Sequence, residues 1–380
     1  MTYPSKKSRV FPLSLLALLV AGPTAAFEVQ VGDTKANVYG YAKLDLIYDL
    51  DADLGNTVNR GNIRLDGEPG PDGHTTLHAF QSRLGVSTAT PTRMGEVKTT
   101  LEGDFFGNGG GNFRLRHAYG EWNGITAGQT WSNFGGLLGM SPTIDFTPQP
   151  GQGNAGRQAQ LRYTLGGFSV ALEDPGNLGK NLAVAAPDSA KNTLPDLTLR
   201  YQGTSGALSY GASALLREIE YYRQASDSDE NALGWGLNLE AAYQLTDGVT
   251  LRGSLTHGDG IGGYLEGSPA GPGYLDPASG AVETIEASGG TAGITVKAGP
   301  GAATLGYGIA RASLDDAVNA GAAGFGGGST DTFEAIHLNY IWSPVGPVSY
   351  GVEVSHHRRG LHDGRDGDAT RLQGMVMYRF

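Results

Sequence analysis

The 380-residue sequence contains no cysteine, so neither disulfide bonds nor thiol chemistry can contribute to this protein. After residue 26 it also lacks any apolar run of the roughly 20 residues that a membrane-spanning helix needs. Charged residues make up only 17% of the chain, and 38 acidic residues outnumber 27 basic ones. A nucleic-acid-binding protein needs a basic face, so this balance excludes that role. Because it has no cysteine, the chain must be stabilised by its fold alone, without disulfide bonds.

Residues 1–26 have the character of an export signal. Lys6, Lys7 and Arg9 form a positive segment, an apolar stretch covers residues 13–21, and small residues at 24–26 precede a cleavage site. A membrane-anchoring helix is the alternative, but the apolar stretch is too short for one. We predict a signal peptide over 1–26 and a mature chain over 27–380. Without those three positive charges the net charge falls from −11 to −14.

Glycine is abundant, at 61 residues, and lacks the three-residue period of collagen. It disfavours long helices, where each glycine costs about 1 kcal/mol relative to alanine. Apolar and polar residues alternate instead, as in Leu197, Leu199 and Tyr201 against Thr198 and Arg200. This period of two indicates β-strands, in a soluble sandwich or in a membrane barrel.

The connections between strands decide between these two folds. Tight turns such as Asn123-Gly124 and Asp247-Gly248 alternate with long connections such as 133–155, 219–232, 259–283 and 358–368. Short periplasmic turns and long outer loops are typical of outer-membrane barrels. We predict an all-β transmembrane antiparallel barrel of about sixteen strands, near residues 37–50, 77–89, 96–106, 113–122, 125–132, 156–164, 167–174, 194–203, 206–218, 233–245, 248–258, 284–297, 301–312, 332–343, 347–357 and 369–380.

Two further patterns favour a membrane barrel over a soluble sandwich. Aromatic residues such as Tyr163, Phe168, Tyr340 and Trp342 lie beside the short turns, where a membrane-interface girdle would place them. The last predicted strand ends in Phe380, as in the assembly signal of outer-membrane barrels. A barrel of this size leaves a water-filled lumen.

The polar face of the predicted strands should line that lumen, because a basic side chain at the lipid midplane costs about 2–4 kcal/mol. Arginine is always charged and binds carboxylates through two parallel hydrogen bonds, so a row of arginines would favour anions. Generic wall charges without selectivity are the alternative. The predicted pore-lining residues are Arg83, Arg114, Arg116, Arg162, Arg200, Arg217, Arg252, Lys43, Lys98, Glu102 and Asp104.

The connection over residues 132–155 is long, partly apolar and rich in glycine and proline. Asp145 is its only charged residue, and Phe146 is among its apolar ones. A loop this apolar should not lie fully in water. We expect it to fold into the lumen and constrict the pore, although packing on a neighbouring subunit is an alternative.

Several stretches, in this order, resemble the DcaP-type outer-membrane porin family. They are Tyr39-Gly40-Tyr41-Ala42-Lys43-Leu44-Asp45, Gln81-Ser82-Arg83-Leu84-Gly85, Glu102-Gly103-Asp104-Phe105-Phe106, Leu115-Arg116-His117-Ala118-Tyr119-Gly120, Ala127-Gly128-Gln129-Thr130-Trp131-Ser132, Leu338-Asn339-Tyr340-Ile341-Trp342-Ser343-Pro344 and Tyr378-Arg379-Phe380. The resemblance implies a trimeric sixteen-stranded porin that favours small anions, including dicarboxylic acids. By position it places Arg83, Arg114 and Arg116 in the lumen wall and 132–155 as the constriction loop.

The function that we expect is therefore passive diffusion of small, preferably anionic, solutes through the outer membrane of a Gram-negative bacterium. We expect membrane lipid and a homotrimer as partners, no nucleic acid, no cofactor, no metal and no catalytic residue. An adhesin or receptor barrel is an alternative. An outer-membrane hydrolase is another, but His74, His78 and His117 are scattered and no G-x-S-x-G motif accompanies them.

Overall fold

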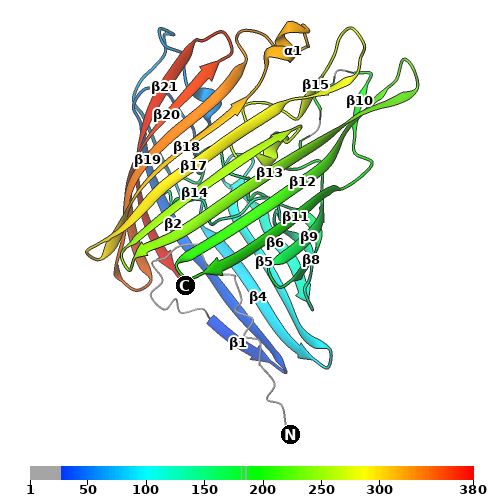
Figure 1. Ribbon diagram of the computed structural model, residues 1–380. Coiled ribbons are helices and arrows are strands. Elements are labelled where there is room, and N and C mark those ends of the chain that lie inside the picture. The colour runs from blue at the N-terminus through cyan, green and yellow to red at the C-terminus, as the bar shows by residue number, and fades with distance from the viewer. Residues whose placement is uncertain (1–26, 181, 185) are drawn as a thin grey trace.

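The computed structural model describes residues 27–180, 182–184 and 186–380, which form a closed antiparallel β-barrel of sixteen spanning strands (Figure 1). β3 (His74–His78) and β4 (Arg83–Thr92) are two parts of one spanning strand, because both pair with β2 (Thr34–Asp49). The other spanning strands are β5 (Gly95–Gly107), β6 (Asn112–Trp122), β7 (Ile125–Trp131), β8 (Arg157–Leu165), β9 (Phe168–Glu173), β11 (Asp196–Ser205), β12 (Leu208–Arg223), β13 (Ser228–Thr246), β14 (Val249–Asp259), β17 (Glu286–Ala298), β18 (Gly301–Ala312), β19 (Thr330–Val345), β20 (Val348–Leu361) and β21 (Asp366–Arg379). The predicted fold class is confirmed, and each predicted strand range overlaps a strand.

Short elements complete the described chain. β1 (Phe27–Val31) pairs with the first half of β2, beyond the end of the barrel at which the C-terminus lies (Figure 1). The outer loops contain β10 (Ser189–Lys191), β15 (Gly273–Leu275), β16 (Val282–Thr284), α1 (Asp315–Asn319) and two short 3-10 turns over Arg60–Asn62 and Gly262–Tyr264. No helix among the described residues is long and apolar enough to cross a membrane. The predicted signal peptide, 1–26, lies outside the described residues.

The pairing of β2 with β21 closes the barrel. Its register runs from Tyr41 opposite Arg379 to Asp49 opposite Arg371. Gly40 and Phe380 add two backbone hydrogen bonds of 3.1 and 3.2 Å. A Cβ atom on Gly40 would lie 2.2 Å from the Arg83 carbonyl oxygen and 2.8 Å from the Phe380 ring, so this position needs glycine. The last residue of the chain thus takes part in the closure.

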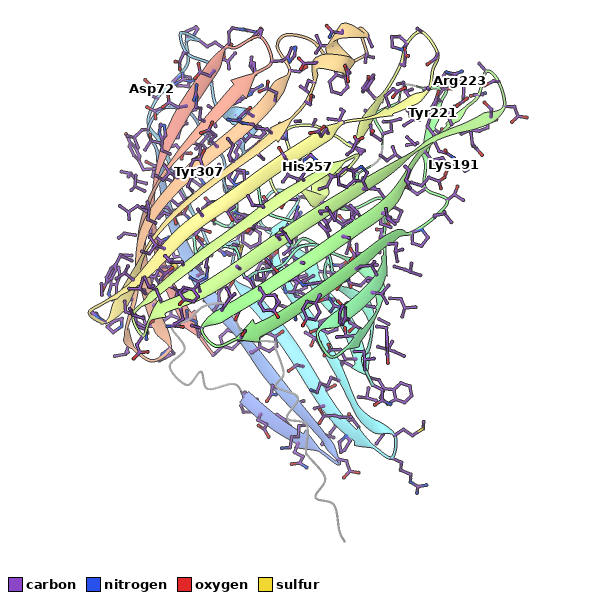
Figure 2. All side chains as sticks on the ribbon, viewed as in Figure 1. Asp72, Lys191, Tyr221, Arg223, His257 and Tyr307 are labelled. Atoms are coloured by element: carbon purple, nitrogen blue, oxygen red, sulfur yellow. The ribbon has the colours of Figure 1, made fainter. Side chains whose placement is uncertain are left out.

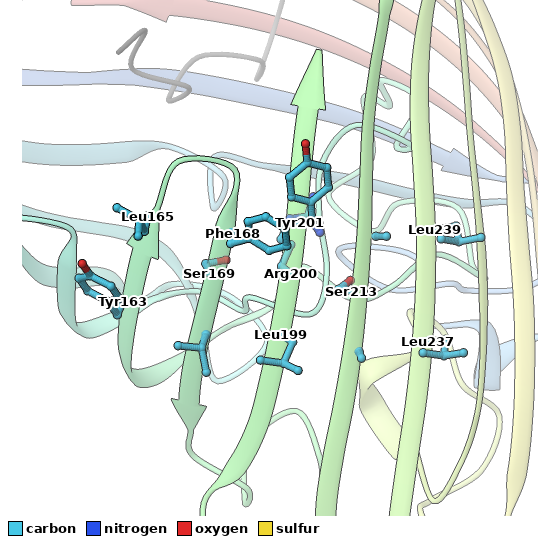
Figure 3. A pocket seen from close by; sticks show the side chains of 13 residues that line it. Tyr163, Leu165, Phe168, Ser169, Leu199, Arg200, Tyr201, Ser213, Leu237 and Leu239 are labelled. Atoms are coloured by element: carbon cyan, nitrogen blue, oxygen red, sulfur yellow. The ribbon is translucent and has the colours of Figure 1, made fainter. Parts of the chain in front are cut away.

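The two faces of the wall differ as the alternation predicts. On β13, Leu237 and Leu239 are 53% and 57% exposed, whereas the intervening Asn238 and Glu240 are 1% and 5% exposed. The outward face is therefore the apolar one. It carries a shallow groove over β9, β11, β12 and β13, where the small Ala212 and Ala214 lie among larger apolar side chains (Figure 3).

An aromatic girdle marks one edge of this apolar face. Tyr340, Trp342 and Tyr350 stack in succession, with ring centroids 5.4 and 5.6 Å apart, beside the short connection from β19 to β20. The apolar ring of such a residue can contact lipid while its polar O–H or N–H group contacts water, so these residues are typical of the membrane–water interface.

Two outer connections are shorter than the sequence predicted. The 219–232 loop is reduced to residues 224–227 and the 358–368 loop to residues 362–365, because the flanking strands extend further. Above the membrane, Ile219 and Tyr221 are buried in a cluster with Leu182 and Val282 of neighbouring outer loops. This packing stabilises the tall β12–β13 hairpin, where Figure 2 shows Arg223 near the far end.

The tall hairpin makes the topology testable with trypsin. In intact cells trypsin should cut after Arg223, next to the 224–227 turn, because that turn lies outside the cell. Arg93, which is exposed in the turn between β4 and β5 at the opposite end, should be cut only once the outer membrane is permeabilised. Fragment masses measured by mass spectrometry report both sites. Cleavage after Arg93 in intact cells would mean that the orientation is inverted.

Candidate functional site

Residues 132–155, here called the inner loop, leave β7 and follow the inward face of the wall before they return to β8. Three wall carboxylates on β9, β13 and β20 accept hydrogen bonds from backbone N–H groups of this loop. They are Glu173 with Asn133 at 2.6 Å, Glu240 with Leu138 at 3.1 Å, and Glu353 with Ile144 at 2.9 Å. Hydrogen bonds of this kind stabilise the ionised carboxylates and occupy their acceptor positions.

A strip of glycines on the wall makes room for the inner loop. A Cβ atom on Gly351 of β20 would lie 2.7 Å from Ile144, and one on Gly306 of β18 would lie 2.7 Å from the Gln149 amide. Gly308 and Gly293 face the loop equally closely. Real Cβ atoms do not approach other atoms this closely. At Gly308 the nearest atom is the Pro150 backbone oxygen, at 2.2 Å, so a side chain there would displace the loop. This packing accounts for part of the high glycine content.

The tip of the inner loop holds both residues that the sequence singled out. Asp145 is 2% exposed and forms an ion pair of 2.8 Å with Arg371 of β21. Burial on its own would raise the pKa of Asp145, but Arg371 and hydrogen bonds from Thr57 and Thr147 lower that pKa to about 2. The ionised form therefore stabilises the fold above the ordinary pKa of 3.8, and that contribution is lost only as the pH falls towards 2.

Phe146 faces the other side of the barrel. Its ring stacks on Phe106 of β5, with centroids 4.9 Å apart and an interplanar angle of 15°. The guanidinium groups of Arg114 and Arg116 lie 5.3 and 5.4 Å from the same ring. The tip thus lies between the β20–β21 wall, which holds Asp145, and the arginines of β6.

Five of the predicted pore residues form one ion-pair network with Arg116 at its centre. Arg116 is 2% exposed and contacts Glu102 and Asp104, each at 2.8 Å. Asp104 also pairs with Arg114 at 2.7 Å. Arg83 of β4 joins through Glu102 at 3.3 Å. The sequence predicted these five residues separately, and the structure brings them together.

A β-bulge on β6 changes the alternation within this network. Glu102 opposes His117, whereas the next residue, Gly103, opposes Leu115, so Arg116 is the extra residue. Arg116 and His117 are therefore both buried on the inward side. Without a bulge, strict alternation from Phe113 and Leu115 would place Tyr119 on their outward face. The bulge shifts Tyr119 to the inward face instead.

Arg157 is a basic residue of this region that the sequence analysis missed. Its guanidinium lies 4.9 Å from the centroid of the Trp131 ring, and that of Arg116 lies 5.9 Å from the same ring. Arg157 is the first residue of β8. In this strand the polar positions are Gln158, Gln160 and Arg162, so the alternation did not predict that Arg157 also belongs to this region. The residue opposite it on β7 is Trp131, and an arginine–tryptophan contact at that position could have indicated its place.

Arg157 and Arg162 of β8 have no ion pair within the described part of the chain. Together with Arg83, Arg114 and Arg116 they define what is here called the basic strip, on β4, β6 and β8. Arg252, on β14, also faces inward and donates a hydrogen bond of 3.2 Å to Thr295. Within the described residues, the basic strip thus carries two guanidinium groups, those of Arg157 and Arg162, that no carboxylate binds directly.

The remaining predicted basic residues lie apart from the strip. Lys43 is buried, pairs with Asp45 at 2.8 Å and donates to the Ile144 carbonyl at 2.9 Å. Arg200 pairs with Glu240. Arg217 is buried beneath outer loops and donates to the Gly179 carbonyl at 2.6 Å. These three stabilise the wall and its loops.

Lys98 does not join any of these groups. It lies on the part of β5 that extends past the end of β21, is half exposed, and pairs with Glu96 at 3.3 Å. The polar alternation of β5 continues beyond the closed barrel, which is why the sequence grouped Lys98 with the wall residues.

Comparison with known proteins agrees with this geometry. The profile of the family described as DcaP outer membrane protein matches residues 23–265. The chain belongs to this DcaP family. A search of curated proteins by sequence found no match.

This DcaP-family protein is also similar in structure to solved outer-membrane channels. The crystal structure of the outer membrane channel DcaP of Acinetobacter baumannii is similar with a TM-score of 0.80 and 27% identity, over 94% of this chain and 100% of that one. An anion-selective porin from Comamonas acidovorans has a TM-score of 0.60 and 14% identity, over 91% and 100%. OmpT of Vibrio cholerae has a TM-score of 0.57 and 12% identity, over 93% and 100%. The last two share the fold.

The family and the fold together assign this protein to the outer membrane of a Gram-negative bacterium, as a porin and not an enzyme. Among the described residues there is also no group of three or more His, Cys, Asp or Glu that could hold a metal ion.

The central arginine of the network should be required for stability. Arg116→Ala would leave Glu102 and Asp104 buried without their shared partner, which costs about 3–5 kcal/mol. Unfolding of the purified protein in urea and detergent, followed by tryptophan fluorescence, measures this loss. Arg365→Ala, which removes an exposed pair with Asp363 in an outer loop, is the control and should change little. Equal stability of both variants would show that the network contributes nothing.

Proposed function

We propose that this DcaP-family protein forms a water-filled diffusion channel that prefers small anions, carboxylates and dicarboxylates among them. The observation that carries the proposal is the charge imbalance of the basic strip. Among the described residues, its five guanidinium groups form ion pairs with only two carboxylates, those of Glu102 and Asp104. Arg157 and Arg162 therefore keep their charge available to a passing anion.

The acids of the opposite wall are occupied by other partners. Its carboxylates Glu173, Glu240 and Glu353 accept backbone N–H groups of the inner loop, and Glu240 also pairs with Arg200. Asp145 pairs with Arg371. Few acids therefore remain free to attract cations at this level of the lumen, although the whole chain has a net negative charge.

The inner loop also supports the proposal, because it would form the constriction of the channel. It places Phe146 against Arg114 and Arg116, so solutes would pass close to the basic strip. A solute with two carboxylates could interact with two arginines at once, because each guanidinium matches one carboxylate through parallel hydrogen bonds. A homotrimer is part of the proposal, as for OmpT of Vibrio cholerae, which has a structure in a trimer form.

The unpaired arginines provide the test. A unit charge about 8 Å from an ion is worth roughly 2 kcal/mol at an effective dielectric of about 20, before screening by salt. Arg157→Gln combined with Arg162→Gln should therefore lower the anion-to-cation permeability ratio roughly fivefold at about 0.1 M salt. The reversal potential across a tenfold KCl gradient in planar bilayers measures this ratio.

Arg93→Gln is the matched control, because it removes a positive charge from an exposed turn outside the lumen. It should leave the reversal potential unchanged. Liposome swelling should fall for succinate in the double variant and stay constant for a neutral sugar of similar size. A double variant with the wild-type reversal potential would contradict the role of the basic strip.

A further inference from the structure

The tip of the inner loop is held from three strands of the wall at once. Glu353 of β20 binds the N–H groups of Ile144 and Asp145, at 2.9 and 3.2 Å. Lys43 of β2 donates to the Ile144 carbonyl at 2.9 Å. Arg371 of β21 pairs with the Asp145 carboxylate at 2.8 Å. All three wall side chains are at most 5% exposed. They bind two consecutive residues, so the position of the tip is strongly determined.

Glu353 uses both of its oxygens in this arrangement. Oε2 accepts from Ile144 N and from Asn339 Nδ2, each at 2.9 Å. Oε1 accepts from Asp145 N at 3.2 Å and lies 3.4 Å from His337 Nδ1. Because four polar groups surround the carboxylate, it is not available to ions in the lumen. Its contacts are with the loop and with its neighbours in the wall.

We propose that Glu353 is the positioning residue of the constriction, which fixes the tip of the inner loop and thereby sets the size limit of the channel. The inference rests on the proposed function in one respect, namely that the inner loop narrows the lumen. Glu353 then acts on solute size through the loop, and its own charge has little part in ion selectivity. Lys43 and Arg371 assist it by binding the same two residues.

Substitution by glutamine should release the tip for a chemical reason. Glutamine is almost the same size as glutamate but has one acceptor oxygen and an NH₂ group. In Glu353→Gln that NH₂ group would face a backbone N–H of Ile144 or Asp145, so one donor would meet another. The wild-type geometry needs acceptors on both sides. One loop hydrogen bond is therefore lost, and repulsion replaces it.

A cross-link can hold the loop independently of Glu353. The chain has no cysteine, so two introduced cysteines can form a disulfide only with each other. A Cβ atom on Gly293 of β17 would lie 3.1 Å from the Ser141 Cβ. A disulfide needs about 3.5–4.5 Å between Cβ atoms, so a shift of a few tenths of an ångström suffices. Ser141→Cys with Gly293→Cys thus ties the inner loop to the wall.

The experiment measures liposome swelling with neutral sugars of increasing size. Glu353→Gln is made in the Ser141→Cys, Gly293→Cys background, assembled in its oxidised form and then reduced in the membrane. Before reduction, swelling should fall steeply with sugar size, as in the wild type. After reduction, the larger sugars should enter several-fold faster and the open-channel current should become noisier. Two free thiols crowd this position, so the double-cysteine protein with Glu353 intact is reduced in parallel, and its response should be several-fold smaller than that of the Glu353→Gln variant.

Glu121→Gln in the same background is the charge-matched control. Glu121 is an exposed acid of β6 and makes no hydrogen bond with the inner loop among the described residues. Reduction should leave its sugar selectivity unchanged. If reduction also leaves Glu353→Gln unchanged, or changes both variants alike, the proposal is wrong. Neutral sugars report size alone, so this result is independent of anion preference, which the wild-type reversal potential tests separately.

Discussion

Unpaired backbone amides cannot face lipid without a cost of several kcal/mol each, and the pairing of β2 with β21 removes the last such edge from this chain. The rest of the structure depends on that closure. Once the barrel is closed, each strand has one face in lipid and one face in the lumen. The outward face becomes apolar, and every polar side chain that the strands carry at membrane depth must lie inside. The functional residues are therefore concentrated on one surface.

The interior is divided into two walls of different character. On one side, glycines and hydrogen-bonding carboxylates bind the inner loop along β9 to β20. On the other side, β4, β6 and β8 carry the basic strip, whose charges exceed those of the acids beside them. Phe146 lies where the two sides meet. In the proposed function, the first wall fixes the width of the passage and the second selects the ions.

The sequence was sufficient for the fold because local patterns report it directly. Alternation over residues 235–244 and tight turns such as Asn123-Gly124 depend on neighbouring residues only. Errors occurred where tertiary contacts override the local pattern. The β12–β13 hairpin extends because Ile219 and Tyr221 pack against other loops. The bulge at Arg116 reverses the faces of the residues after it, and β1 forms only because β2 extends past the barrel.

The candidate site was less accessible from the sequence. Charge and alternation identified Arg83, Arg114 and Arg116 and their acidic partners, because the alternation of β6 holds from Arg114 as far as the bulge at Arg116. The sequence could not reveal that Lys43 and Glu353 bind the same loop residue, because those two are separated by most of the chain and meet only through closure. Arg157 was missed at a strand end, where alternation no longer applies.

The proposed preference of the lumen for anions contrasts with the net negative charge of the chain. It is tested most directly by the reversal potential of the wild-type channel across a tenfold KCl gradient, recorded at low ionic strength and again near 1 M. Anion preference predicts a potential with the sign of chloride selectivity, and a weaker one near 1 M, where the Debye length is about 3 Å. A potential with the sign of potassium selectivity at low ionic strength would contradict it.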